Sequence, residues 1–133
     1  MARIGMFDGR QQKWIDFDAD TEVLVAFLDK EQIMALRKKG AKQARLSGGD
    51  VDVITNRLIG EAGCLGWHKK TDHNHPGLLT AKGVAIPFND AKRDMLMKGC
   101  REFSNFINDT AMDSAEFLEE EIDPAELDAA KNG

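Results

Sequence analysis

The chain has 133 residues, of which 42% are hydrophobic and 31% are charged, and its net charge is −5. This balance predicts one globular domain in water, and the acidic charge argues against general nucleic-acid binding. Two cysteines predict no disulfide framework, and the longest apolar run, Val23–Leu28, is too short to span a membrane. We therefore expect a reduced cytoplasmic protein that binds no nucleic acid and no membrane.

The first predicted structure is a small β element. Residues 1–13 contain two glycines among mixed polar residues, and we expect them to be irregular. A period-two pattern over residues 14–18, a turn at Asp18–Asp20 and the β-rich run Val23–Leu28 follow. Together they predict a hairpin or a two- to three-stranded sheet, which must lie on helices because an isolated hairpin is only marginally stable.

Two helices are expected next, each with an aspartate at its N-cap. Asp29 begins a basic helix that runs to about Leu46, and Gly40 weakens its middle by roughly 1 kcal/mol relative to alanine. After a break, Asp50 begins a second helix whose apolar face has three- and four-residue spacing: Val51, Ile54, Leu58, Ala62 and Leu65. Gly63 and Gly66 are expected to end this helix.

The second half of the chain predicts a long loop and further helices. Residues 67–87 predict a loop, with a short strand at 83–86 as an alternative. Asn89 caps a third helix whose apolar residues share one buried face: Leu96, Cys100, Phe103 and Ile107. Residues 110–113 break or re-cap that helix, and an acidic helix or tail follows.

These elements predict an α+β fold dominated by helices, in which a small N-terminal antiparallel β element packs on three to four helices. We expect residues 1–133 to form a single domain, with an irregular N-terminus over 1–13, a core over about 14–112 and an acidic C-terminal helix or tail over 113–133. Charge is uneven along it, because residues 30–45 carry six basic and one acidic side chain, whereas residues 102–133 carry ten acidic and one basic. These charges can pair within the molecule or between copies in a homo-oligomer, and two solvated faces are the alternative.

No catalytic constellation is convincing, and we expect neither enzyme activity nor a cofactor. Cys64 and His68 lie four residues apart, but their sequence context supplies no oxyanion hole for a nucleophile. The metal-ligand candidates are His68, His73 and His75, which gather with Cys64 within twelve residues. Their spacing matches no common zinc pattern, and histidines in a polar loop are usually solvated, so the sequence predicts no metal site.

Two apolar features call for an interpretation. A Trp after a helix-ending glycine, paired with a Phe just before an N-cap, is typical of a clamp that pins a long loop to a core. We therefore interpret four residues as structural: Gly66, Trp67, Pro87 and Phe88. The second feature is an apolar stripe in the acidic C-terminal segment, formed by Phe117, Leu118 and Ile122. It either packs on the chain's own core or binds a partner, and both interpretations stay open.

The order of these motifs resembles the small tail assembly chaperones of long-tailed bacteriophages and prophages. The resemblance covers roughly residues 21–118 and consists of a strand that leads directly into a basic helix, a helix that runs into Leu65-Gly66-Trp67, a polar loop before Ile86-Pro87-Phe88-Asn89, and a last helix that carries Phe103 and Ile107. Gly66, Trp67, Pro87 and Phe88 match the family pattern. The histidine-rich loop and the basic run Arg37–Arg45 depart from it.

The resemblance implies a function without catalysis. Proteins of this family bind the long, aggregation-prone tape measure protein and keep it soluble until the tail tube protein polymerises around it. Many are also made in a longer form by programmed frameshifting. The expected partners are therefore the tape measure protein and, as a second candidate, the tail tube protein. The alternative is a small phage tail completion or head–tail joining subunit. A metal-binding module is a third alternative, which the sequence favours less than the other two.

Overall fold

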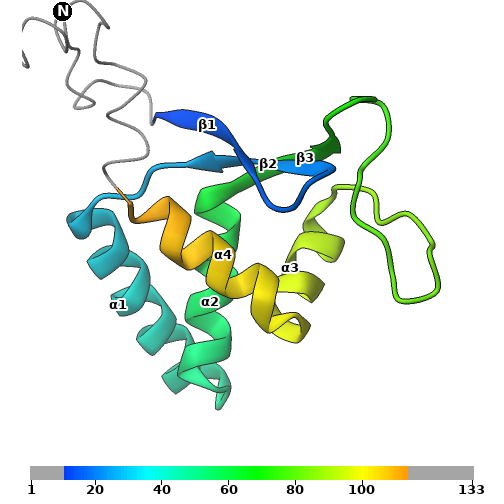
Figure 1. Cartoon of the computed structure of the whole chain (residues 1–133). Helices are drawn as coiled ribbons and strands as arrows, with labels where there is room; N and C mark the ends of the chain where they lie inside the picture. The colour runs from blue at the N-terminus through cyan, green and yellow to red at the C-terminus, as the bar shows by residue number, and fades with distance from the viewer. Residues whose placement is uncertain (1–10, 114–133) are drawn as a thin grey trace, which may run out of the picture.

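Three antiparallel strands form a sheet that covers one side of four helices in the computed structural model, which describes residues 11–113 (Figure 1). In chain order the elements are β1 (Gln12–Asp16), β2 (Thr21–Ala26), α1 (Lys30–Ser47), α2 (Val51–Gly63), β3 (Cys64–Lys69), α3 (Asp90–Gly99) and α4 (Arg101–Ala111). The strand order is β1-β2-β3, so β2 is central. The predicted α+β fold, with a small antiparallel sheet packed on helices, is confirmed.

The N-terminal hairpin forms where the alternating pattern predicted it. The carboxylate of Asp18 accepts hydrogen bonds from the backbone N–H groups of Asp20 and Thr21, at 2.8 and 2.7 Å, and so shapes the turn. Strand β1 begins at Gln12, just inside the segment that was expected to be irregular. Val23 and Val25 on β2 are fully buried, and they point toward the helices as part of the core.

Helices α1 and α2 begin at the predicted aspartate caps. The Asp29 carboxylate accepts the Gln32 N–H, and the Gln32 side chain accepts the Asp29 N–H, both at 2.8 Å, which completes a capping box. Gly40 has a role that the sequence did not reveal, because a Cβ there would lie 2.2 Å from Thr55 Oγ1 on α2. Glycine therefore permits the close approach of α1 and α2, which offsets its low helix propensity.

Strand β3 corrects the prediction that the second helix continues to Leu65. Helix α2 ends at Gly63, and Cys64 already has extended dihedrals, with φ −106° and ψ 108°. The chain then pairs antiparallel with β2, placing Trp67 opposite Val23. Here the pairing with β2 decides the local structure, although the apolar residues continue at helical spacing. The spacing alone could not reveal this strand, because its partner lies far away in the sequence. Gly66 consequently lies inside a strand and does not end the helix.

The single third helix that was predicted is two helices. Cys100 separates α3 from α4 with φ −118° and ψ 101°, although its N–H still donates to the carbonyl oxygen of Leu96 at 2.9 Å. Gly99, a weak helix former, directly precedes the break. The break lets Phe103 and Ile107 on α4 pack under the sheet, while Met97 on α3 packs against Gly60 of α2.

The long connection between β3 and α3 contains no strand of its own among the described residues. The alternative strand at 83–86 reduces to one isolated bridge between Leu79 and Ala85, closed by a turn at Gly83 with φ 82°. Acidic residues 114–133, predicted as a helix or tail, lie outside the described part of the chain. Within residues 11–113, no helix has the length and apolar character that crossing a membrane requires.

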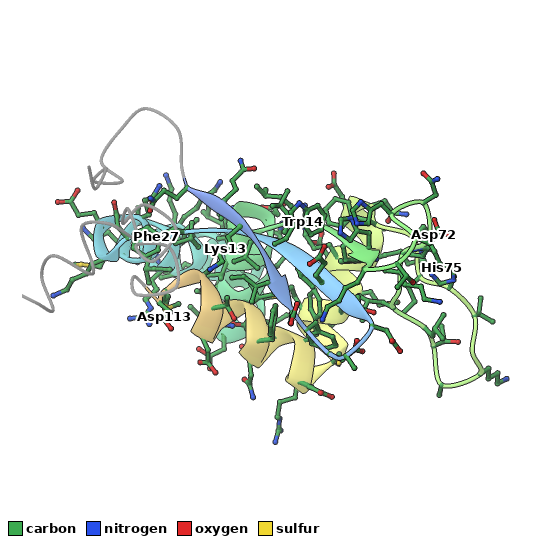
Figure 2. All side chains as sticks on the ribbon, turned by 45° about the horizontal axis from the view of Figure 1, so that its top comes forward. Lys13, Trp14, Phe27, Asp72, His75 and Asp113 are labelled. Carbon is green, nitrogen blue, oxygen red and sulfur yellow. The ribbon has the colours of Figure 1, made fainter. Side chains whose placement is uncertain are left out.

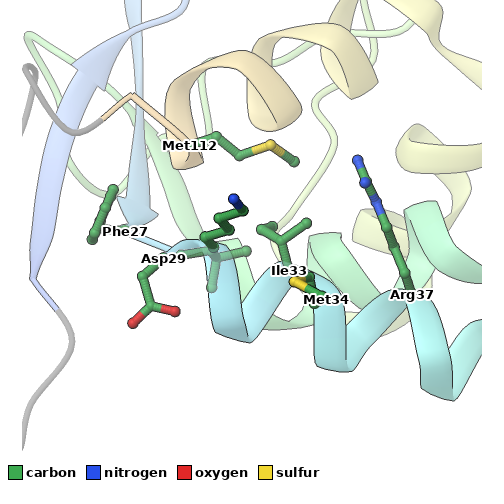
Figure 3. Close-up of a pocket in the computed structure, with 8 residues that line it drawn as sticks. Phe27, Asp29, Ile33, Met34, Arg37 and Met112 are labelled. Atoms are coloured by element: carbon green, nitrogen blue, oxygen red, sulfur yellow. The ribbon is translucent and has the colours of Figure 1, made fainter.

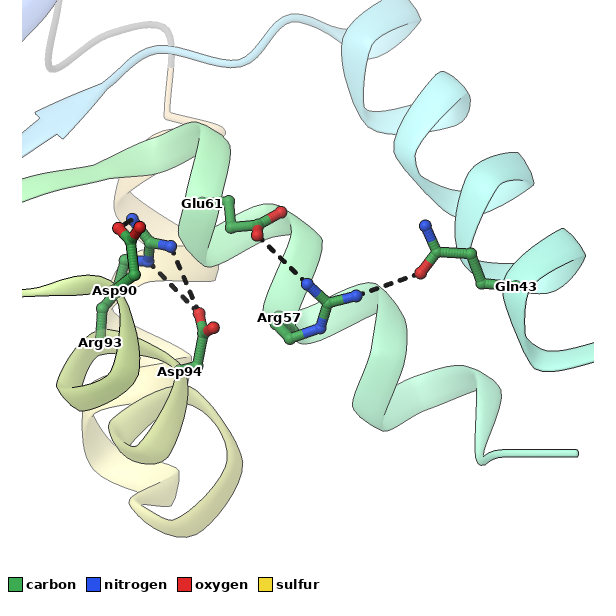
Figure 4. Close-up of polar contacts among 6 residues, drawn as sticks. All are labelled: Gln43, Arg57, Glu61, Asp90, Arg93 and Asp94. Carbon is green, nitrogen blue, oxygen red and sulfur yellow. Dashed lines mark hydrogen bonds and ion pairs between the residues drawn. The ribbon is translucent and has the colours of Figure 1, made fainter. Parts of the chain in front are cut away.

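Two arginine side chains of the helical layer make polar contacts with neighbouring side chains (Figure 4). Arg57 on α2 donates to Gln43 Oε1 on α1 at 3.1 Å and pairs with Glu61 at the same distance. Arg93 on α3 is buried, and its guanidinium pairs with Asp90 at 3.1 Å and Asp94 at 3.4 Å. Among these contacts, the Arg57–Gln43 hydrogen bond joins α2 to α1, and the others lie within a single helix.

Candidate functional site

Trp67 connects the sheet, the long loop and α4. Its indole Nε1–H donates to the carbonyl oxygen of Ile86 at 2.8 Å. Its ring meets Phe88 edge-to-face at 4.8 Å between ring centroids, and Phe103 at 5.7 Å. The loop therefore returns to the core directly before Asn89, whose side chain caps α3 by accepting the Lys92 N–H at 2.8 Å. The structure brings together the Trp and the Phe that the sequence singled out.

The other two residues of the proposed clamp have different surroundings. Pro87 is exposed, between the buried Ile86 and the half-buried Phe88. Gly66 faces away from the helices, and a Cβ there would lie 3.8 Å from Cη2 of Trp14, which is an ordinary contact distance. Its small size leaves the outer face of β3 open to the indole of Trp14. The clamp proper is thus the pair Trp67 and Phe88.

A stack of rings covers the outer face of the sheet. Alternation along the strands places Glu22 and His68, which are partners across β2 and β3, on the face away from the helices. The two side chains meet at 2.6 Å between Glu22 Oε1 and His68 Nε2. Trp14 stacks on His68 at 3.7 Å, and His73 stacks on it at 3.8 Å, so the two rings lie on opposite sides of the imidazole. Figure 2 shows Trp14 on the strands and the loop after β3 beside it.

This stack contains the residues with the best potential to hold a metal. Glu22, His68 and His73 each place one ligand atom within 4.8 Å of the other two. However, the planes of the two imidazoles differ by only 6° and are stacked. A metal ion lies close to the ring plane of each histidine ligand, about 2.0–2.1 Å from its nitrogen for zinc, and one ion cannot meet this for two stacked rings. As arranged, the residues fit a carboxylate–imidazole hydrogen bond within a ring stack and do not fit a metal centre.

The remaining candidates for metal or covalent chemistry lie elsewhere. His75 Nδ1 accepts the Gly77 N–H at 2.9 Å within the loop, so this nitrogen is already used. Cys64 belongs to the buried core, and burial raises the pKa of its thiol from 9.0 to about 12. It is also separated from His68 by four residues of strand, a distance of about 13 Å. The i, i+4 pairing considered for a nucleophile therefore does not form.

The third feature is an apolar groove between the end of β2, the start of α1 and the end of α4 (Figure 3). Its volume is about 650 Å³, and its lining residues are Phe27, Leu28, Asp29, Lys30, Ile33, Met34, Arg37 and Met112. The Leu28 N–H donates to the carbonyl oxygen of Ala111 at 2.9 Å, which ties the start of α1 to the end of α4. Met34 and Met112 line this groove although they are 49% and 37% exposed, respectively, so its wall has two flexible thioether side chains open to solvent.

Two cations of α1, Lys30 and Arg37, line the groove together with Asp29. Helix α1 carries six cationic side chains and one acidic side chain. None of the six forms an ion pair with another residue of the range 11–113: Lys30, Arg37, Lys38, Lys39, Lys42 and Arg45. Figure 3 shows Arg37 projecting from α1 beside Met112. The groove therefore combines apolar walls with two cations and one carboxylate, and four further cations lie along α1 outside its lining.

The groove was not predicted from the sequence, because it forms only where Met112, directly after α4, comes to lie beside residues 27–37. The only available signals were the methionines, which core packing explained equally well. Phe117, Leu118 and Ile122, the partner-binding candidates, lie outside the described residues. No protein-family model, curated protein or solved structure matches this chain.

Proposed function

We propose that this chain is a tail assembly chaperone of a long-tailed bacteriophage or prophage, which works without catalysis in the host cytoplasm. Its client is the tape measure protein, which it keeps soluble while the tail is assembled. The observation that carries the proposal is the apolar groove between β2, α1 and α4, which Lys30 and Arg37 line beside its apolar residues. The short motifs that resemble the family supply the identity of the client.

The chemistry of the groove suits a segment of an aggregation-prone helical protein. A volume of about 650 Å³ lies within the range of about 300–1,000 Å³ that is typical of binding sites. An amphipathic helix binds such a groove through apolar side chains spaced three and four residues apart. Met34 and Met112 can adjust to different apolar side chains, which a chaperone needs if it binds several segments of one long client.

The cations in the groove lining favour one orientation of a bound helix. Lys30 and Arg37 line the groove beside its apolar residues. Acidic residues that flank the apolar stripe of a client helix would meet these cations, which favours one direction of binding. The groove therefore selects an amphipathic segment with acidic flanks over an apolar segment without charge.

Co-expression with the tape measure protein of the same genome tests the proposal. We expect the chain to raise the soluble fraction of the client and to co-purify with it. Met34→Asp should lower the co-purified client about tenfold, because a carboxylate in the groove wall removes an apolar contact. Met95→Asp is the matched control, since Met95 is 47% exposed on α3 and lies outside the groove lining, whereas Met34 is 49% exposed.

Two results would contradict the proposal. Client binding that is no weaker in Met34→Asp than in Met95→Asp, with helix content retained in both variants, would show that the groove is not the contact. Absence of any rescue, together with stoichiometric recovery of the chain in purified particles, would instead favour a tail completion or head–tail joining subunit.

A further inference from the structure

The groove lies where the described part of the chain ends. Met112 contributes to its wall, and Asp113 is the last described residue. The segment that follows, residues 114–133, therefore starts at the edge of the groove. Phe117 lies five positions after Met112, a span of about 8 Å as helix or about 17 Å when extended. The apolar stripe of this segment is thus within reach of the groove without a long connecting loop.

The charge of this segment complements that of helix α1. Residues 114–133 contain seven acidic residues and one lysine. Helix α1 has the opposite balance, and its six cations form no ion pair within residues 11–113. The segment also places apolar and acidic residues side by side, because Phe117 and Leu118 directly precede the acidic run Glu119–Glu121. The groove likewise has apolar residues beside cations.

We infer that the C-terminal segment of this chain docks in the groove between β2, α1 and α4. Phe117, Leu118 and Ile122 supply the apolar contacts, and the acidic residues among them pair with the cations of α1. The short connection from Met112 favours docking within one molecule, because a tethered segment has an effective concentration in the millimolar range. A second copy of the chain would have to bind in competition with it.

Docking of this segment has a consequence for the client, and this step rests on the proposed function. The segment and the tape measure protein would use the same groove, so we expect them to compete for it. The segment is thus a built-in competitor that the client must outbind.

A disulfide trap in the full chain tests the docking itself. Cys100→Ser removes the more accessible native thiol, whereas Cys64 is buried in the core. In this background, Met34→Cys with Leu118→Cys is oxidised with glutathione disulfide, and the intramolecular product is followed over time. Met95→Cys with Leu118→Cys is the matched control on α3. We expect the Met34 pair to form its disulfide at least about tenfold faster than the Met95 pair.

A second variant separates docking from mere proximity to the chain end. Adding Phe117→Asp and Ile122→Asp to the Met34 pair should slow disulfide formation about tenfold, because the apolar contacts are lost. An unchanged rate, or equal rates for the Met34 and Met95 pairs, would overturn the inference. A disulfide-linked dimer in place of the monomeric product would assign the groove to a second copy and would also overturn it.

The client arm distinguishes failure of this inference from failure of the proposed function. Added tape measure protein should slow disulfide formation by the Met34 pair, and Phe117→Asp with Ile122→Asp should increase client capture. If the disulfide forms as expected but the client changes neither quantity, docking stands and the competition is refuted. If the client binds but the disulfide results fail, the proposed function stands and the docking is refuted.

Discussion

Trp67 donates its indole N–H to the carbonyl oxygen of Ile86 at 2.8 Å, across nineteen residues of sequence, and both groups are buried. The bond joins the last strand of the sheet to the end of the connection that leads into α3. Because Phe88 packs edge-to-face on the same ring, the return point of the connection is held by a polar and an apolar contact together. Between these points, Leu78 is buried in the core, and the Lys70 N–H donates to the carbonyl oxygen of Asp20 at 2.8 Å.

Trp67→Phe should lower the free energy of unfolding by about 1–3 kcal/mol, because an aromatic ring remains while the buried Ile86 carbonyl loses its donor. The measurement is urea denaturation combined with amide hydrogen exchange. Exchange over residues 78–86 should accelerate more than exchange in β2. Trp14→Phe is the control, since Trp14 is 39% exposed on the outer face and should cost less. Equal costs for the two variants would contradict the role assigned to the Trp67 bond.

Thr21→Val should stabilise the protein by about 1 kcal/mol. Thr21 is fully buried, and its Oγ1 has no hydrogen-bond partner in the described part of the chain. Valine keeps the shape and removes a hydroxyl that is desolvated without compensation. Thr21→Ala should have the opposite sign, because it leaves a cavity next to Gly77. Thermal unfolding of both variants checks the prediction, and a loss of stability in Thr21→Val would show that the hydroxyl is satisfied.

Cys64 should resist alkylation under conditions that modify Cys100. Burial raises the pKa of the Cys64 thiol from 9.0 to about 12, whereas Cys100 is only partly buried. The Cys64 thiol therefore keeps its proton in the folded state at pH values where the unfolded chain has lost it. The contribution of this thiol to the free energy of unfolding is fully present below pH 9.0 and is lost as the pH rises toward its folded-state pKa of about 12. Iodoacetamide mapping by mass spectrometry tests the first statement. For the second, the fall in unfolding free energy over this pH range should be shallower in Cys64→Ala.

The hairpin and the helix caps could be predicted because their determinants are local. Asp29 and Gln32 exchange hydrogen bonds within one turn, and Asp18 shapes its turn with residues two and three positions away. Strand β3 could not be predicted, since Leu65 continues the apolar spacing of α2 while the pairing with Leu24 and its neighbours is remote in sequence. The same limit applies to the break at Cys100, which depends on how α4 packs under the sheet.

For the candidate sites too, local features could be predicted from the sequence and contacts between remote residues could not. Trp67 and Phe88 could be paired from the sequence because each flanks one end of a recognisable loop. The partner of His68 could not, because Glu22 lies 46 residues away and only the sheet register brings the two together. The groove could not be predicted either, because it forms only where the chain brings Met112 beside residues 27–37, and the exposure of Met34 and Met112 depends on how α1 and α4 pack.

The ring stack on the outer face of the sheet leads to a prediction about metals. Glu22, His68 and His73 have the right atoms for a transition metal, but the two imidazoles are parallel with centroids 3.8 Å apart. Binding one ion would require His73 to leave the stack and Glu22 to leave Nε2 of His68, where it lies at 2.6 Å. Binding an ion would therefore cost the stacking of His73 on His68 and the hydrogen bond between Glu22 and His68.

We therefore expect the purified protein to retain no stoichiometric zinc after dialysis, as measured by inductively coupled plasma mass spectrometry. EDTA should leave its melting temperature unchanged. His68→Ala should destabilise the fold by about 1–3 kcal/mol, because it leaves the half-buried Glu22 carboxylate without its partner, whereas the exposed His73 should cost less when replaced by alanine. One equivalent of zinc, lost together with stability in both His68→Ala and His73→Ala, would reverse this assignment and favour a metal-binding module.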